Sequence, residues 1–224
     1  MPFQRTIACL ANSKKNSGRC IAGKEMQPDG SWRWIRPVGI EASREITETD
    51  RQYENGATAQ VLDLVTIVFS KADDHPYQAE NLIIDPNYHW RKDGDFDRLG
   101  MEALLDRPDS LWEIGDSSYS GLNDRIASAL LTEHRSTLFL IEPKKVRITV
   151  GAEGARFGDM KRKVRAHFSY NGAEYAILIT DPIAESHYTR LENGTHELAY
   201  GKYFTVSLAE PYKEHSYKVV AAII

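Results

Sequence analysis

Residues 161–180 read KRKVRAHFSYNGAEYAILIT, and the Asn171-Gly172 pair at the centre is the strongest structural signal in the chain. A two-residue Asn-Gly loop supplies the positive φ angles that a type I′ β-hairpin requires. The flanking runs, 161–170 and 173–180, alternate apolar and polar residues as strands with one buried face do. The stretch therefore predicts an antiparallel hairpin, and with it a mainly β protein.

The loop length also fixes the register of this hairpin, in which Phe168 faces Tyr175. We expect one face of the ribbon to be buried, with the residues Val164, Ala166, Phe168, Tyr175, Ile177 and Ile179. The other face carries Lys163, Arg165 and His167, which form a basic row with Lys161. Such a row can contact the phosphates of a nucleic-acid strand, and it can equally be a solvated face without a ligand.

Further strand-like runs lie on both sides of the hairpin. They are residues 3–11, 19–23, 31–38, 60–69, 137–150, 202–209 and 216–224. A polar loop at 12–18 and a Pro28-Asp29-Gly30 turn separate the first three runs. Each end of the chain thus has enough strands for a small barrel of OB type. We expect two tandem OB-like β-barrels, one in residues 1–136 and one in residues 137–224.

Residues 71–136 interrupt the β pattern. Two short helices are expected in this part, one from Asp95 as N-cap through FDRLGMEALL and one through NDRIASALLTEH. The sequence therefore predicts an acidic, partly helical connecting segment attached to the first barrel.

The composition excludes disordered and membrane-embedded classes. Of 224 residues, 42% are hydrophobic and 27% are charged, and no apolar run is long enough to span a bilayer. We expect a cytoplasmic protein that does not contact membranes. Cys9 and Cys20 are the only cysteines, and we expect both to be reduced, buried thiols.

The net charge of −4 is unevenly distributed. By residue count, the net charge is +5 over residues 1–36, −11 over 37–136 and +2 over 137–224. Within the last part, residues 144–165 contain eight basic and two acidic side chains. These basic islands can face a polyanion, or they can neutralise the acidic middle of the chain.

A second candidate surface lies near the N-terminus. Trp32, Trp34 and Arg36 share one face of the expected strand, because side chains two residues apart point the same way. They can form a stacking platform for bases, or they can be core residues. The basic residues Lys14, Lys15 and Arg19 are expected close to this platform.

Motifs for catalysis and metal binding are incomplete in this chain. Gly18 to Lys24 has P-loop spacing, but Glu25 follows where magnesium needs Ser or Thr. The Asp93, Asp95 and Asp97 series lacks the glycine and the glutamate of a calcium loop. We expect no metal and no cofactor, and the sequence leaves enzymatic activity unsupported without excluding it.

Several short stretches together resemble the bacterial dual OB-containing domain family. They are Cys9-Leu-Ala-Asn-Ser13, Gly18-Arg-Cys-Ile-Ala-Gly23, Trp34-Ile-Arg-Pro-Val38, Gly121-Leu-Asn-Asp-Arg125, Lys161-Arg-Lys-Val-Arg165, Thr180-Asp-Pro182 and Lys218-Val-Val-Ala-Ala-Ile-Ile224. The resemblance covers nearly the whole chain. It implies two OB-type barrels in tandem and, by analogy with other OB-folds, binding of nucleic acid or a nucleotide.

The sequence thus favours a non-catalytic protein that binds single-stranded DNA or RNA. Two alternatives stay open. The first is a protein-interaction or nucleotide-sensing subunit of a larger bacterial system, such as a defence system, with a protein partner at the acidic middle. The second is a nucleotide-processing enzyme.

Overall fold

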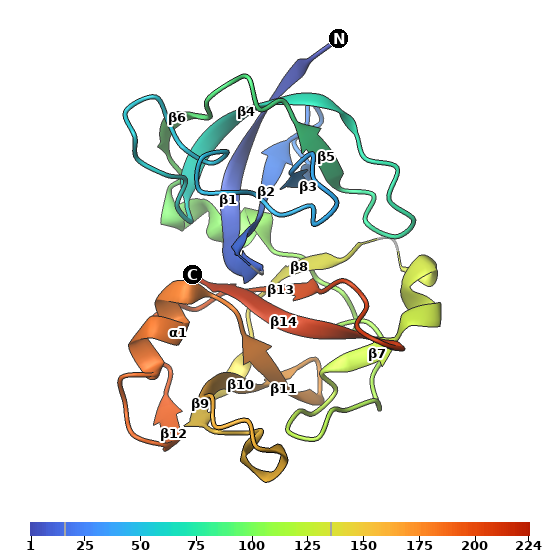
Figure 1. Cartoon of the computed structure of the whole chain (residues 1–224), viewed down its shortest axis with the longest axis vertical. Coiled ribbons are helices and arrows are strands. Elements are labelled where there is room, and N and C mark those ends of the chain that lie inside the picture. Colours follow the sequence, from blue (N-terminus) through green and yellow to red (C-terminus); the bar gives the residue numbers. More distant parts are fainter. Residues whose placement is uncertain (16, 135) are drawn as a thin grey trace. The chain divides into compact units, whose positions relative to one another are not determined.

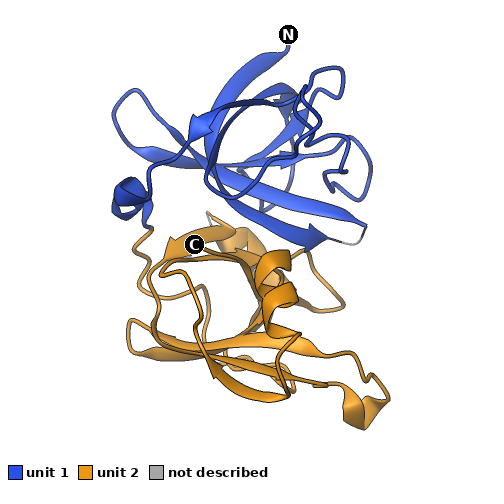
Figure 2. Cartoon of the chain, turned by 90° about the vertical axis from the view of Figure 1, so that its left-hand side faces the viewer, with its two compact units in different colours: residues 1–105 blue, residues 106–224 orange. Residues whose placement is uncertain are grey.

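The structure, a computed structural model, describes residues 1–15, 17–134 and 136–224. The protein is mainly β, as predicted, and its strands form two sheets (Figure 1). It divides into two compact units, Met1–Leu105 and Asp106–Ile224 (Figure 2). The boundary expected between residues 136 and 137 therefore falls inside the second unit. The second unit begins at Asp106, because the Asp106 amide already donates to the carbonyl of Leu140 within this unit, at 2.8 Å.

The first unit contains a six-stranded sheet within the described residues. Its strands are β1 (Phe3–Lys15), β2 (Gly18–Met26), β3 (Trp32–Val38), β4 (Asp63–Ala72), β5 (Asn81–Ile84) and β6 (Arg91–Asp95). Antiparallel pairings join β1 to β2, β2 to β3, β5 to β4 and β4 to β1. A parallel pairing joins β3 to β5. Followed through β2, β3, β5 and β4, the pairings that start at β1 therefore return to β1. The strand β6 pairs with β4 outside this series.

The core of the first unit lies on one face of these strands. Ile7 and Cys9 of β1 point into it, and so do Val65, Ile67 and Phe69 of β4. Both cysteines are free thiols, but Cys20 is only half-buried, whereas we expected it to be buried like Cys9. β1 also extends to Lys15, well into the loop expected at 12–18. Asn16 of that loop lies outside the described residues.

The second unit contains an eight-stranded sheet and a short helix within the described residues. Its elements are β7 (Arg125–Ala127), β8 (Leu138–Ile141), β9 (Lys144–Gly151), β10 (Lys163–Tyr170), β11 (Ala173–Ile179), α1 (Pro182–Tyr188), β12 (Gly194–Glu197), β13 (Phe204–Leu208) and β14 (His215–Ile223). The strands are paired in the order β12-β9-β10-β11-β14-β13-β8, and β7 pairs with β14.

The hairpin of β10 and β11 confirms the prediction from Asn171-Gly172. Both residues adopt positive φ angles, 47° and 83°, and Phe168 pairs with Tyr175. All six apolar residues expected on the inner face are buried: Val164, Ala166, Phe168, Tyr175, Ile177 and Ile179. The rings of Phe168 and Tyr175 stack at 5.4 Å, and Phe204 packs edge-on against Phe168 at 5.6 Å.

One order of strand pairing occurs in both units. The series β9, β10, β11, β14, β13 repeats the series β1, β2, β3, β5, β4, and the third and fourth members of each series pair in parallel. The single strand predicted at 137–150 is divided at Glu142 and Pro143, because proline cannot donate to a ladder. β8 pairs with β13, whereas β9 pairs with β10. The doubled plan expected from the sequence is therefore present as a repeated pairing order.

The acidic stretch at 71–136 does not form the expected helical connector. It supplies β5 and β6 to the first sheet and β7 to the second. Its helical turns are short 3₁₀ segments, Arg98–Leu104 and Ser128–Glu133, and Asp97 rather than Asp95 caps the first. The edge strand β6 was missed because its side chains stay mostly exposed and lack apolar alternation. In the described part of the chain, no helix has the length and hydrophobicity to cross a membrane.

Candidate nucleic-acid interface

The residues expected to form a stacking platform lie on β3. Trp32, Trp34 and Arg36 share one face of this strand, as their spacing predicts. Trp34 and Arg36 are only 9% and 5% exposed, whereas Trp32 is half-buried. The Lys24 ammonium lies 5.0 Å from the centre of the Trp34 ring, and Arg36 donates to the Glu80 carboxylate at 3.1 Å. The three residues therefore do not form an exposed platform, because packing covers two of them.

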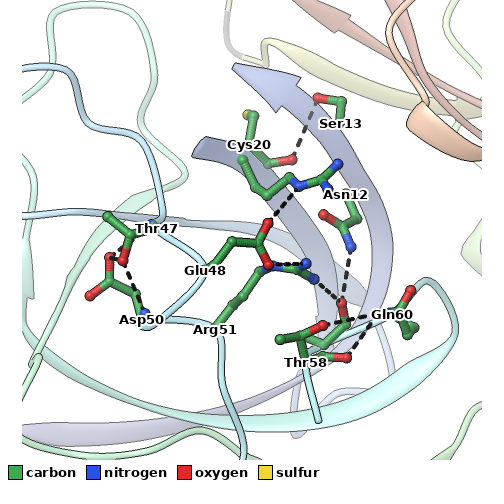
Figure 3. Close-up of polar contacts among 11 residues, drawn as sticks. Asn12, Ser13, Cys20, Thr47, Glu48, Asp50, Arg51, Thr58 and Gln60 are labelled. Atoms are coloured by element: carbon green, nitrogen blue, oxygen red, sulfur yellow. Dashed lines mark hydrogen bonds and ion pairs between the residues drawn. The ribbon is translucent and has the colours of Figure 1, made fainter. Parts of the chain in front are cut away.

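The basic residues expected beside this platform lie where β1 meets β2. Lys14 is exposed and Lys15 is half-buried. Arg19 donates to the Glu48 carboxylate at 3.1 Å. The same carboxylate accepts from Arg51 at 2.9 Å (Figure 3). The charge of Arg19 is therefore used to hold the segment between β3 and β4 against the hairpin.

The same polar cluster continues along that segment. Asn12 of β1 and the Arg51 guanidinium both donate to the Ala59 carbonyl at 2.9 Å. Asp50 accepts from the amide and the hydroxyl of Thr47, at 2.8 and 2.7 Å (Figure 3). These contacts give the cluster a structural role, since they join an irregular loop to the sheet.

The basic row expected on the outer face of β10 is only partly accessible. Lys161 is exposed and Lys163 is half-buried, and neither side chain has a hydrogen bond or an ion pair within the described residues. His167 is half-buried, and its ring lies 3.0 Å from the Thr149 hydroxyl. Burial, and then the neighbouring Arg165, lower the pKa of His167 below 6.5. The His167 ring is therefore neutral at pH 7 and does not add to the charge of the row.

Arg165 lies at the centre of a buried ion-pair network. Its guanidinium makes two hydrogen bonds to Glu153, at 2.8 and 2.7 Å, and one to Asp124 at 3.2 Å. It also donates to the Ala176 carbonyl at 2.8 Å. Asp124 in turn accepts from the amide of Ser118 at 2.7 Å. Arg165 is thus unavailable for the phosphate contact expected of it, because its donors hold two surface loops.

These two loops meet in a pair of exposed aromatic rings. Tyr119 lies in the loop that ends at Asp124, and Phe157 lies in the loop between β9 and β10. Their ring centroids are 5.3 Å apart, with the planes at 79°. Tyr119 is 67% exposed and Phe157 is 71% exposed. The sequence pattern did not single out either ring, although Phe157 stands within the basic stretch 144–165.

Cations and an apolar side chain accompany these rings. Arg156 precedes Phe157 in the loop, and the exposed Met160 and Lys161 follow it. Arg162 differs from them, since it donates to the carbonyls of Thr189 and Leu191 and fixes the end of the loop. We define the aromatic-basic patch as the exposed Tyr119, Arg156, Phe157, Met160 and Lys161 together with the half-buried Lys163.

The patch combines the two contacts that single-stranded nucleic acids offer. Aromatic faces stack on bases, and nearby cations neutralise phosphates. OB-folds contact oligonucleotides partly through the loop between their first and second strands, and the β9–β10 loop has that place in the pairing order. Among the described residues, no three His, Cys, Asp or Glu side chains are grouped so that they could hold a metal ion.

The chain is thus a mainly β protein whose two sheets share one order of strand pairing. The second sheet carries the loop with the aromatic and basic residues. The chain matches the dual OB-containing domain family over residues 5–223 and belongs to that family. The resemblance inferred from the sequence is thereby confirmed. Comparison with curated proteins and with solved structures finds no match.

Proposed function

We propose that the protein binds single-stranded DNA or RNA, without converting it, through the aromatic-basic patch. The observation that carries the proposal is the exposed Tyr119 and Phe157 pair, since the loop of Phe157 also carries Arg156 and Lys161 and leads into Lys163 of β10. None of these three cations has a side-chain partner within the described residues. Membership of an OB-containing family supports the proposal, because OB-folds are frequent binders of oligonucleotides.

The proposal extends to the architecture and the compartment. We propose that each unit is an OB-type β-barrel, with the repeated order of strand pairing as the support. We also propose that the protein acts in the cytoplasm, where its two free thiols stay reduced.

The preference for single strands follows from the chemistry of the patch. Bases in a duplex cover each other's faces, whereas unpaired bases can leave the stack and lie on aromatic side chains. The protein has a net charge of −4, so the attraction must come from a local cluster of cations. We therefore expect weak duplex binding and clear dependence of single-strand binding on salt.

Fluorescence anisotropy with a labelled oligonucleotide of about 15 bases tests this proposal. Replacing Phe157 by Ala should weaken binding by about 1–3 kcal/mol, the contribution of one stacked base. Replacing Arg156, Lys161 and Lys163 by Gln should flatten the plot of log affinity against log salt by about 2 units, at roughly 0.7 per phosphate contact.

Two exposed residues of the first unit provide matched controls. Tyr88→Ala removes an exposed ring, and Lys71→Gln removes an exposed cation, both outside the patch. Both variants should bind like the unmodified protein. Absence of binding to DNA and RNA at about 50 mM salt would refute the proposal. The interaction or nucleotide-sensing function would then take its place.

A further inference from the structure

A groove of about 410 Å³ lies on the first unit and shares no residue with the aromatic-basic patch, which belongs to the second unit. It crosses the face of the sheet that is turned away from the core, because Thr6 and Ala8 alternate with the core residues Ile7 and Cys9. Its lining comes from five strands and includes Thr6 of β1, Glu25 of β2, Trp32 of β3, Thr66 of β4 and Arg91 of β6. A hollow of this size suits a small ligand.

Trp32 supplies an aromatic wall to this groove. It is the only one of the four tryptophans that is half-buried, since Trp34, Trp90 and Trp112 are at most 9% exposed. Phe96 packs edge-on against it, with centroids 5.9 Å apart and planes at 84°. The Trp32 ring is therefore supported from one side and can stack on a flat ligand.

The floor of the groove presents hydrogen-bond acceptors. Thr66 donates its hydroxyl proton to Asp93, and the Thr6 hydroxyl lies within hydrogen-bond distance of the Thr66 hydroxyl. Arg91, and then Thr66, lower the pKa of Asp93, so this carboxylate is ionised and can only accept. Thr6 must then donate to Thr66, and both hydroxyl oxygens keep lone pairs for the N–H groups of a ligand.

A cation lies at one side of this floor. The Nε of Arg91 donates to Asp93 at 2.6 Å, and the Arg91 side chain remains 66% exposed. The two terminal NH₂ groups of Arg91 have no partner within the described residues. They are the donors that a phosphate accepts from.

We propose that this groove binds a nucleoside monophosphate, with the base on Trp32, its amino group on Thr6 and Thr66, and its phosphate on Arg91. The nucleotide can be free or can stand at the 5′ end of a strand, because both present the same groups. This site is independent of the aromatic-basic patch and goes beyond the function proposed above.

Calorimetric titration with adenosine monophosphate tests the site, and quenching of tryptophan emission gives a second readout. Arg91→Gln should weaken adenosine monophosphate about tenfold and leave adenosine unaffected, because only the phosphate contact is lost. Thr6→Val keeps the β-branched shape and should weaken adenosine about two- to tenfold. Purine riboside, which lacks the amino group, should bind both the unmodified protein and Thr6→Val equally.

The controls separate this groove from its surroundings and from the patch. Lys71→Gln removes an exposed cation of the same unit that does not line the groove, and it should leave adenosine monophosphate binding unchanged. A 5′-phosphorylated oligonucleotide that competes with adenosine monophosphate would show that a strand end can fill the same site. A strand that does not compete would show that the site takes free nucleotides.

Two results would overturn the assignment. One is absence of adenosine monophosphate binding at millimolar concentration. The other is binding that is lost in Phe157→Ala but unaffected in Arg91→Gln and Thr6→Val, which would place the nucleotide in the patch. The second result would leave the proposed nucleic-acid function intact.

Discussion

Replacing Arg165 by Met is the sharpest test of how the patch is held together. The substitution removes the guanidinium but keeps an apolar stem of similar length. It leaves the Asp124 carboxylate, which is 4% exposed, without its ion-pair partner, and the Ala176 carbonyl keeps only its hydrogen bond from the Leu122 amide. Breaking a buried pair in this way costs about 3–5 kcal/mol. We expect about 3 kcal/mol, because Asp124 keeps its hydrogen bonds from Ser118.

Urea unfolding followed by circular dichroism measures this loss, and a double-mutant cycle with Asp124→Asn isolates the interaction between the two residues. Arg165→Lys should recover only part of the stability, because lysine cannot make the two parallel bonds to Glu153. Arg165→Met should also weaken oligonucleotide binding, since the Tyr119 and Phe157 loops lose their common anchor. A loss below about 1 kcal/mol, typical of surface pairs, would refute this reasoning.

Three further predictions concern the core, the thiols and the response to pH. Phe168→Ala should lower the free energy of unfolding by about 3–5 kcal/mol in a urea titration, and a loss under about 1 kcal/mol would contradict its place in the core. Iodoacetamide should modify Cys20 in the native protein and leave Cys9 unmodified, because burial raises the pKa of the Cys9 thiol to about 12; early modification of Cys9 would show that the first core opens. Burial lowers the pKa of Lys218 to about 8, although Asp124, Glu113 and Asp116 oppose this shift. Between pH 8 and pH 10.5 the unfolded chain keeps this proton and the folded protein loses it, so the free energy of unfolding should rise with pH relative to that of Lys218→Met. If the difference in free energy of unfolding between the two proteins does not change with pH in urea titrations, the prediction is wrong.

The sequence predicted the features that depend on neighbouring residues. The β10–β11 hairpin followed from the backbone preferences of Asn171 and Gly172, and the register then placed every inner residue. Helix α1 was not predicted, although the sequence carries a local signal for it: Asp181 accepts from the first amides of the helix and Pro182 begins it. The edge strands β6 and β12 had none, since their exposed side chains show no apolar alternation.

The candidate site depended on contacts between distant parts of the chain. The position of Arg165 on the face opposite the core was predictable, but its burial was not. That burial requires Asp124, from the acidic middle, to fold over the outer face of β10. Part of the basic island thus neutralises acidic side chains, which is one of the two alternatives that the charge distribution left open. Tyr119 lies in the loop that ends at Asp124, and the fold of this loop brings it to Phe157. The spacing of residues in the sequence therefore could not predict the contact between the two rings.

The position of β14 in the second sheet bears on the timing of folding during synthesis. β14 lies between β11 and β13 and also pairs with β7, so three other strands depend on it. It is also the last strand of its unit, ending at Ile223. The first unit can assemble once residue 105 has left the ribosome, whereas the second must wait for its central strand. Until then one edge of β11 lacks its pairing strand, and nascent chains of this length are the ones most exposed to aggregation or to chaperones.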